Sequence, residues 1–247
     1  MALIHSFEKS GNFLFRNRGQ IPVILYILVI PVIYFTDYSK LSDITQLILT
    51  CISIFLSVLG FIIRAVSIGT TPQGTSGRNR ESQVAESLNI TGIYSTVRHP
   101  LYLGNYLLWI GIILFTFNIY FVIIVSLAFW LYYERIMFAE ERFLEGKFGE
   151  EYMNWSHKVP AFIPCFKNYR KSETPFSPVS VLRREYSGFL ATVFSFTFID
   201  YLRYFFIHGR IDIYRTSTYV LIIALIITII LRTLKHNTRL LNEEGRS

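Results

Sequence analysis

Cysteine is scarce in this sequence. Only two of its 247 residues are cysteines, Cys51 and Cys165. They lie far apart along the chain and show no spacing typical of metal ligands. The sequence therefore predicts neither a disulfide bond nor a metal site.

Charge is scarce as well, and long runs have none. Charged residues make up 17% of the chain, whereas hydrophobic residues make up 52% and aromatic residues 17%. The mean hydropathy is +0.40, above what a soluble domain of ordinary composition carries. These values exclude an ordinary soluble domain and predict an all-α, polytopic membrane protein.

The uncharged runs indicate where the chain crosses the membrane. A helix needs roughly 20 apolar residues to span a bilayer, or fewer where the bilayer thins. By this measure the sequence predicts about six transmembrane helices. They lie between Arg18 and Asp37, between Asp43 and Arg64, twice within His99 to Tyr133 with a turn near Asn118, from Tyr186 to Ile199, and between Arg215 and Arg232.

The fifth of these spans is followed closely by charge. Asp200 and Arg203 come directly after its uncharged part, at a spacing that places them on one face of a helix. We expect them either to pair inside the membrane or to mark an interfacial helix.

Positive charge is distributed unevenly between the two sides of this topology. Most of the 24 lysines and arginines fall on the side that holds both termini and the segments 69–98 and 134–184. Because lysine and arginine accumulate on the cytoplasmic side, we expect both termini to be cytoplasmic. The net charge of +7 then indicates attraction to anionic lipid headgroups, and no nucleic-acid-binding module is recognisable.

Two polar segments on this side divide the chain. Residues 69–92 are rich in Gly, Ser, Thr and Asn, with a short helical stretch predicted around Glu81 to Leu88. Residues 134–164 continue the fourth span as a helix and then break at Gly149. We therefore expect three parts: N-terminal transmembrane helices in 1–68, a core in 69–166, and an extension with one or two further membrane helices in 167–247.

A basic pair stands directly before the third span. Pro100 suits the first turn of a helix, whose free N–H groups favour an anion that Arg98 and His99 would flank. Arginine at a membrane interface is often only an anchor. Glu140 and Glu141, however, follow the fourth span on the same predicted side. The basic and acidic pairs together would grip a zwitterionic ligand.

Two motifs carry a family resemblance. "GIYSTVRHPLYLG" is followed by a helical hairpin and then by "EERFLEGKFGEEYMNWSHKVPAFIP". This order, over Arg64 to Pro164, resembles the isoprenylcysteine carboxyl methyltransferase family, to which phospholipid methyltransferases and membrane sterol reductases are similar in the same region. The resemblance implies S-adenosylmethionine bound at the cytoplasmic face and a membrane lipid acceptor that arrives sideways from the bilayer. It makes residues 69–166 the methyltransferase core.

The resemblance also assigns residues to the cofactor. By their positions in the motifs, the implied contacts are Asn79, Glu86, Leu88, Asn89, Tyr94, His99, Pro100, Leu101, Tyr102 and Glu140. The family strip His-x-Leu-Val falls on residues 86–89, where only Leu88 matches, and Asn79 stands near a family glutamine.

Two arginines are implied at the acceptor. Arg98 matches a family arginine near the reacting groups, whereas Arg135 stands one residue before the position of the family's substrate arginine, which is Ile136 here. A carboxylate or phosphate oxygen is already anionic and requires no general base. An amine acceptor would need one, and His99 is the nearest candidate. The identity of the acceptor stays open.

Two other functions also stay open. One is a nicotinamide-dependent membrane reductase, because sterol reductases share the Arg-His-Pro-x-Tyr region. The other is a non-catalytic transporter or scaffold. Many transporters are built from paired half-repeats, and the sequence shows none, which argues against this function. Cofactor binding separates the reductase from the methyltransferase.

Overall fold

The chain folds as a bundle of helices. The computed structural model describes residues 2–72, 74–75 and 83–246, and no β-strand is present within these ranges. The helices are α1 (Leu3–Arg16), α2 (Ile21–Phe35), α3 (Asp43–Gly69), α4 (Pro100–Leu114), α5 (Ile119–Phe148), α6 (Glu150–Ser156), α7 (Pro178–His208) and α8 (Thr216–Asn237). The predicted all-α fold class is confirmed.

Six of these helices match the predicted spans in order. Four of them, α3, α5, α7 and α8, are long and apolar enough to cross a membrane, while α2 and α4 are apolar but shorter. The number six is therefore approximate, with four long spans and two short ones. The fifth predicted span, Tyr186 to Ile199, was too short, because α7 runs from Pro178 to His208. The charged residues at either end of the uncharged run, Glu185 and Asp200, are paired with arginines of the bundle.

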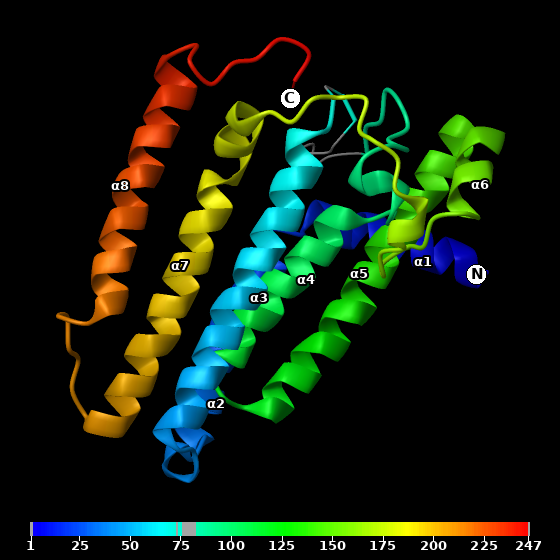
Figure 1. Ribbon diagram of the computed structural model, residues 1–247. Helices are drawn as coiled ribbons and strands as arrows, with labels where there is room; N and C mark the ends of the chain where they lie inside the picture. Colours follow the sequence, from blue (N-terminus) through cyan, green and yellow to red (C-terminus); the bar gives the residue numbers. More distant parts are fainter. Residues whose placement is uncertain (1, 73, 76–82, 247) are drawn as a thin grey trace.

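The two ends of the bundle differ. Figure 1 shows the tight connections α2–α3, α4–α5 and α7–α8 at one end. The segments 83–99, 149–177 and 238–246 gather at the opposite end, which we call the loop end. The carboxyl end of α5, together with α6, also reaches this end.

Local sequence signals explain where the central helices begin and end. The Asn118 side chain accepts a hydrogen bond from the Phe121 backbone N–H at 3.0 Å, which caps α5 and fixes the hairpin turn. Gly149 has a φ of +51°, a conformation that side chains disfavour, and it ends α5 before α6 starts. The predicted turn at Asn118 and the predicted break at Gly149 are both confirmed.

Helices α3 and α4 approach each other through two glycines. A Cβ atom on Gly60 would lie 2.7 Å from the Gly104 carbonyl oxygen, and one on Gly104 would lie 2.9 Å from that of Gly60. Small residues allow such close backbone contact between membrane helices. This contact brings Arg64 of α3 alongside α4.

Asp200 and Arg203 of α7 neither pair with each other nor mark an interfacial helix, the two arrangements expected from the sequence. Asp200 accepts two hydrogen bonds at 2.7 Å from Arg215, next to the start of α8, and one at 2.6 Å from Ser217. The Arg203 guanidinium instead stacks over the Phe117 ring at 3.9 Å. The expected Asp200–Arg203 pairing is wrong because Arg215 satisfies the carboxylate, and α7 is a long bundle helix rather than an interfacial one.

Two smaller expectations meet different outcomes. Cys51 and Cys165 are both free thiols, as predicted. The helical stretch around Glu81 to Leu88 is not seen, because residues 83–88 form bends and irregular backbone. Glu81 itself lies outside the described residues.

Candidate functional site

The site begins where the loop end meets α4. Pro100 occupies the first turn of α4 and His99 caps it. The backbone N–H groups of Arg98 and His99 donate to the carbonyls of Pro160 and Ala161 at 2.9 and 3.1 Å. The segment after α6 therefore fixes the position of both basic residues.

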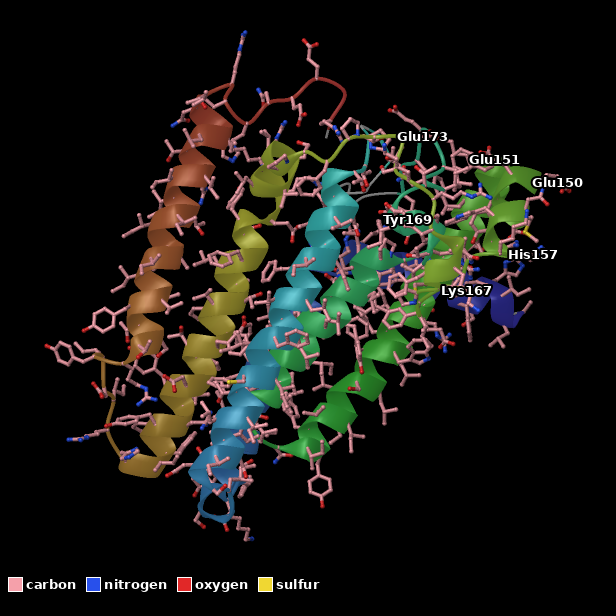
Figure 2. All side chains as sticks on the ribbon, in the orientation of Figure 1. Glu150, Glu151, His157, Lys167, Tyr169 and Glu173 are labelled. Atoms are coloured by element: carbon pink, nitrogen blue, oxygen red, sulfur yellow. The ribbon has the colours of Figure 1, made fainter. Side chains whose placement is uncertain are left out.

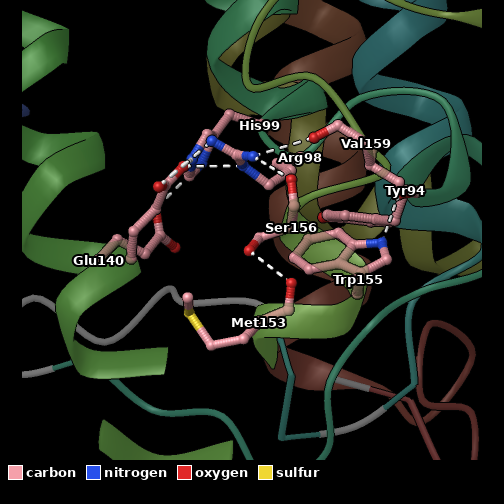
Figure 3. A network of polar contacts seen from close by, with 9 residues as sticks. Tyr94, Arg98, His99, Glu140, Met153, Trp155, Ser156 and Val159 are labelled. Atoms are coloured by element: carbon pink, nitrogen blue, oxygen red, sulfur yellow. Dashed lines mark hydrogen bonds and ion pairs between the residues drawn. The ribbon is translucent and has the colours of Figure 1, made fainter. Parts of the chain in front are cut away.

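Arg98 joins three elements through its guanidinium. It donates to the Glu141 carboxylate at 3.0 and 3.3 Å and to the backbone carbonyls of Ser156 and Val159 at 2.6 and 3.0 Å. Figure 3 shows these contacts converging on one side chain. Arg98 thus ties the start of α4 to α5 and to the end of α6.

His99 lies between the two glutamates of α5. Its Nε2 is 2.8 Å from Glu141 Oε1, and its Nδ1 is 3.6 Å from Glu140 Oε2. The ring is buried, with only 5% of the side chain exposed. Burial lowers the pKa of His99, but the hydrogen bonds and negative charges of Glu140 and Glu141 outweigh it and raise the pKa above its ordinary value.

This raised pKa predicts a pH-dependent contribution to stability. The charged form of His99 stabilises the fold fully below the ordinary pKa of 6.5, and this stabilisation is lost as the pH rises through the raised value. His99→Gln should lower the thermal stability of the detergent-solubilised protein most below about pH 6.5, and less at higher pH. His157→Gln, at an exposed position, is the control. A deficit for His99→Gln that stays constant with pH would contradict the prediction.

These residues border a cavity of about 500 Å³ at the loop end. Its wall includes α1, α3, α4, α5, α6 and α7 as well as segment 83–99. Trp155 of α6 covers one side, and its indole N–H donates to the Tyr94 carbonyl at 3.3 Å (Figure 3). Two long-range contacts, at Arg98 and at Trp155, thus hold α6 against the cavity.

Most of the residues assigned from the sequence meet in this cavity. The lining contains Leu88, Asn89, Tyr94, Arg98, His99, Pro100, Leu101, Tyr102 and Glu140. Glu141, the second member of the predicted acidic pair, also lines it. The motifs around positions 98 and 140 are therefore brought together, as expected from their shared side of the membrane.

Two assigned residues within the described part of the chain are not part of the cavity lining. Glu86 lies with its carboxylate against Gly74. Arg135 stacks its guanidinium on the Phe7 ring of α1 at 3.4 Å, so the acceptor role of Arg135 stays a prediction without geometric support. Asn79 lies outside the described residues. Among the residues that are described, no group of three or more His, Cys, Asp or Glu side chains is arranged to hold a metal ion.

Several cavity residues from outside the core segment are not among those assigned from the sequence. They are Phe15 and Arg18 near the end of α1, Arg64 and Ile68 on α3, and Arg184, Glu185, Ser187 and Gly188 on α7. Charged residues inside otherwise apolar helices were the available signal, since such residues are costly in a membrane and usually have partners. Arg64 and Glu185 are such a pair, with two contacts of 2.7 Å.

The cavity lies at the end of the molecule whose surface is polar. Exposed charged and aromatic side chains surround α6 and the connection to α7, and Figure 2 labels Glu150, Glu151, His157, Lys167, Tyr169 and Glu173 there. The flanks of the long helices instead expose Ile, Leu, Val and Phe. The bundle therefore has apolar sides suited to lipid and a polar loop end that carries the site.

The chain is similar to one known protein family and to several known proteins. The family described as phospholipid methyltransferase matches residues 45–151. The cobalt-zinc-cadmium resistance protein CzcN of Cupriavidus metallidurans is 30% identical over 175 residues, which cover 70% of this chain and 76% of that protein. The protein-S-isoprenylcysteine O-methyltransferase of Schizosaccharomyces pombe is 29% identical over 114 residues, or 44% of this chain and 48% of that enzyme. No solved structure matches the chain.

The matched region contains both charged pairs of the site. Residues 45–151 contain the basic start of α4 and the Glu140–Glu141 pair, which the fold joins at one cavity. The apolar helices make this an integral membrane protein. The chain belongs to the isoprenylcysteine carboxyl methyltransferase-like family of integral membrane methyltransferases, which is related to the phospholipid methyltransferases.

Proposed function

We propose that this chain transfers a methyl group from S-adenosylmethionine to a lipid or lipidated acceptor held in the membrane. A carboxylate or phosphate oxygen is the favoured acceptor. One observation carries the proposal: the basic start of α4 and the acidic pair of α5 face a single cavity at the polar end of an apolar bundle. The cofactor-binding residues proposed are those of the sequence assignment that line this cavity.

The cavity has the size and chemistry to hold S-adenosylmethionine. Its volume of about 500 Å³ lies within the range of small-molecule sites. Glu140, whose side chain is 31% exposed, would bind the ammonium group. The rings of Tyr94, Tyr102 and Trp155, which line the cavity, would stabilise the sulfonium by cation–π contact.

The chain's main task in this reaction is alignment. When bound, S-adenosylmethionine supplies a methyl group on a sulfonium: the S–C bond breaks with its electron pair left on sulfur, and a lone pair of the acceptor oxygen forms the new bond. An anionic oxygen loses its charge in this step, so no proton has to move. Holding the reacting groups in line and excluding water can supply about 7–11 kcal/mol.

Two residues keep the cavity suited to this alignment. Arg98 holds α6 and Glu141 in place and adds a positive charge beside the acceptor. Burial raises the pKa of Tyr94 to about 12, so its phenol stays neutral at physiological pH and can donate a hydrogen bond.

We place the loop end in the cytoplasm. The loop end carries the C-terminal segment 238–246 and the basic segment 149–177, which includes Lys167, Arg170 and Lys171. Positively charged segments of this kind stay on the cytoplasmic side. Labelling of a cysteine introduced at exposed Lys167, in sealed cells and in opened membranes, tests this orientation.

The test of cofactor identity is a binding titration on the detergent-solubilised protein. Calorimetry should show saturable binding of S-adenosylhomocysteine and none of NADPH. Glu140→Ala should weaken S-adenosylhomocysteine binding at least tenfold, about 1.4 kcal/mol, because the carboxylate that faces the cavity is lost. Binding of NADPH alone would instead identify a reductase.

The matched control is Glu145→Ala. Glu145 lies on the same helix but forms an exposed ion pair with Arg142 at 2.7 Å, and such pairs contribute little. Its removal should leave binding nearly unchanged. Equal losses in the two variants would mean that Glu140 is only part of a polar helix face.

A further inference from the structure

Helix α7 belongs to the C-terminal extension, outside the matched residues 45–151. It nevertheless contributes Arg184, Glu185, Ser187 and Gly188 to the cavity. Arg184 and Glu185 are 7% and 8% exposed. Burial of two charged residues beside a cavity is costly unless both are engaged there. The extension is therefore part of the site.

Glu185 fixes the inner wall of the cavity. Its carboxylate receives two hydrogen bonds of 2.7 Å from Arg64 of α3. Arg64 also donates to Asn105 of α4, whose amide donates to the Tyr133 hydroxyl at 3.0 Å. This chain of contacts joins α7, α3, α4 and α5. We call these four residues the polar floor: Arg64, Asn105 and Glu185 line the cavity, and Tyr133 supports Asn105 from behind.

A second, apolar slot lies beyond the polar floor. It has a volume of about 70 Å³ and lies between α2, α4 and α7. Along α4 the lining passes from Asn105 in the cavity to Trp109 in the slot, one helical turn further. Along α7 it passes from Gly188 to Ser195, about 10 Å at 1.5 Å per residue. The start of α2 shows the same order, from Gly19 just before the helix to Pro22 in its first turn.

Cavity and slot share no lining residue, but they follow each other in depth along α4 and α7. The polar floor stands at the change from polar to apolar lining, and a lipid changes in the same way from its headgroup to its hydrocarbon chain. The slot is lined almost wholly by apolar side chains, with the Tyr26 and Ser195 hydroxyls, 2.6 Å apart, bonded to each other. Its volume limits an occupant to part of one hydrocarbon chain.

We propose that cavity and slot form one crevice, which is the acceptor site: one hydrocarbon chain of the lipid occupies the α2–α4–α7 slot, and its anionic headgroup passes the polar floor into the cavity. Helix α7 then determines acceptor specificity, and Glu185 is a positioning residue that holds Arg64 and Asn105 at this level. This inference rests on the proposed methyl transfer. It adds where the acceptor lipid binds and that the slot accommodates one hydrocarbon chain.

Filling the slot tests the inference. Transfer of radiolabel from S-adenosylmethionine to a total membrane-lipid extract is measured for wild type, Ser195→Phe and Ala191→Phe. Ser195→Phe should raise the apparent KM for lipid at least tenfold while S-adenosylhomocysteine binding is retained. Ala191, one turn earlier on α7, is exposed on the bundle surface, so Ala191→Phe should behave as wild type.

A second measurement does not depend on turnover or on the folding of Ser195→Phe. Spin-labelled stearic acid should quench the tryptophan fluorescence of the full-length protein in a saturable way. Trp109→Phe should remove the saturable part, whereas Trp130→Phe, at a residue 46% exposed on the outer surface, should not.

The outcomes separate the two proposals. If wild type transfers methyl groups but Ser195→Phe keeps its KM, or if quenching does not depend on Trp109, the slot is filled only by ordinary bilayer chains and the inference is overturned. If wild type neither binds S-adenosylhomocysteine nor transfers label, the proposed function itself fails.

Discussion

Arg98→Ala is expected to reduce methyl transfer by at least about 100-fold. The substitution removes hydrogen bonds to the Glu141 carboxylate and to the carbonyls of Ser156 and Val159. Together these charge-assisted bonds are worth on the order of 3 kcal/mol. Their loss removes one of the two side-chain contacts that hold α6 at the cavity, the other being that of Trp155, and leaves Glu141 beside His99 without its arginine. Transfer of label to the membrane-lipid extract measures the effect.

Two further variants make this prediction specific. Arg98→Lys should recover only part of the activity, because an ammonium group cannot span a carboxylate and two carbonyls as the planar guanidinium does. Arg142→Ala removes an exposed arginine that pairs with Glu145 and should retain nearly full activity. Wild-type turnover in Arg98→Ala would show that the reaction needs neither the contacts between Arg98 and the end of α6 nor the positive charge of Arg98.

Gly104→Val is expected to destabilise the protein by about 3 kcal/mol or more. A Cβ atom at this position lies 2.5 Å from Cγ of Arg64 and 2.9 Å from the Gly60 carbonyl oxygen. The arginine side chain can shift, but the backbone of α3 cannot do so without separating from α4. We expect a lower unfolding temperature in detergent and loss of the Arg64–Glu185 contact.

Gly146→Val is the matched control for this prediction. Gly146 lies in α5, and a Cβ atom there meets nothing within 4 Å. Because valine is also a better helix former than glycine, the control should be neutral or slightly stabilising. Equal unfolding temperatures for Gly104→Val and wild type would mean that α3 and α4 can separate at little cost.

Features set by one or two residues could be predicted from the sequence. Pro100 fixes its own φ and lacks an N–H, so it marks the start of α4 wherever the chain is placed. Asn118 and Gly149 act in the same local way at the two ends of α5. The motifs around them then placed Arg98 and Glu140 on one side of the membrane, and the fold brings both to the cavity.

Features set by distant contacts could not be predicted in this way. Arg64 and Glu185 are 121 residues apart in the sequence, and only the packing of α7 against α3 shows that they pair. Helix α1 was missed because counting uncharged runs finds spans and not surface helices. Its apolar residues recur on one face, which an amphipathic helix requires, and Gly11 lets it lie against the Arg135 carbonyl. That packing explains why Arg135 faces Phe7 instead of the cavity.

The bond between Asp200 and Arg215 also bears on how the chain reaches the membrane during synthesis. An isolated α7 would carry Asp200 and Arg203 in its carboxyl-terminal half, where an unpaired charge opposes entry into the bilayer. Arg215 lies just before α8, so it meets Asp200 only when both helices are present. The Tyr201 and Thr218 hydroxyls, 2.6 Å apart, add a second contact across the same pair. Helices α7 and α8 therefore favour insertion together as a hairpin, and a nascent chain that ends before Arg215 should be held at the translocon rather than released into the bilayer.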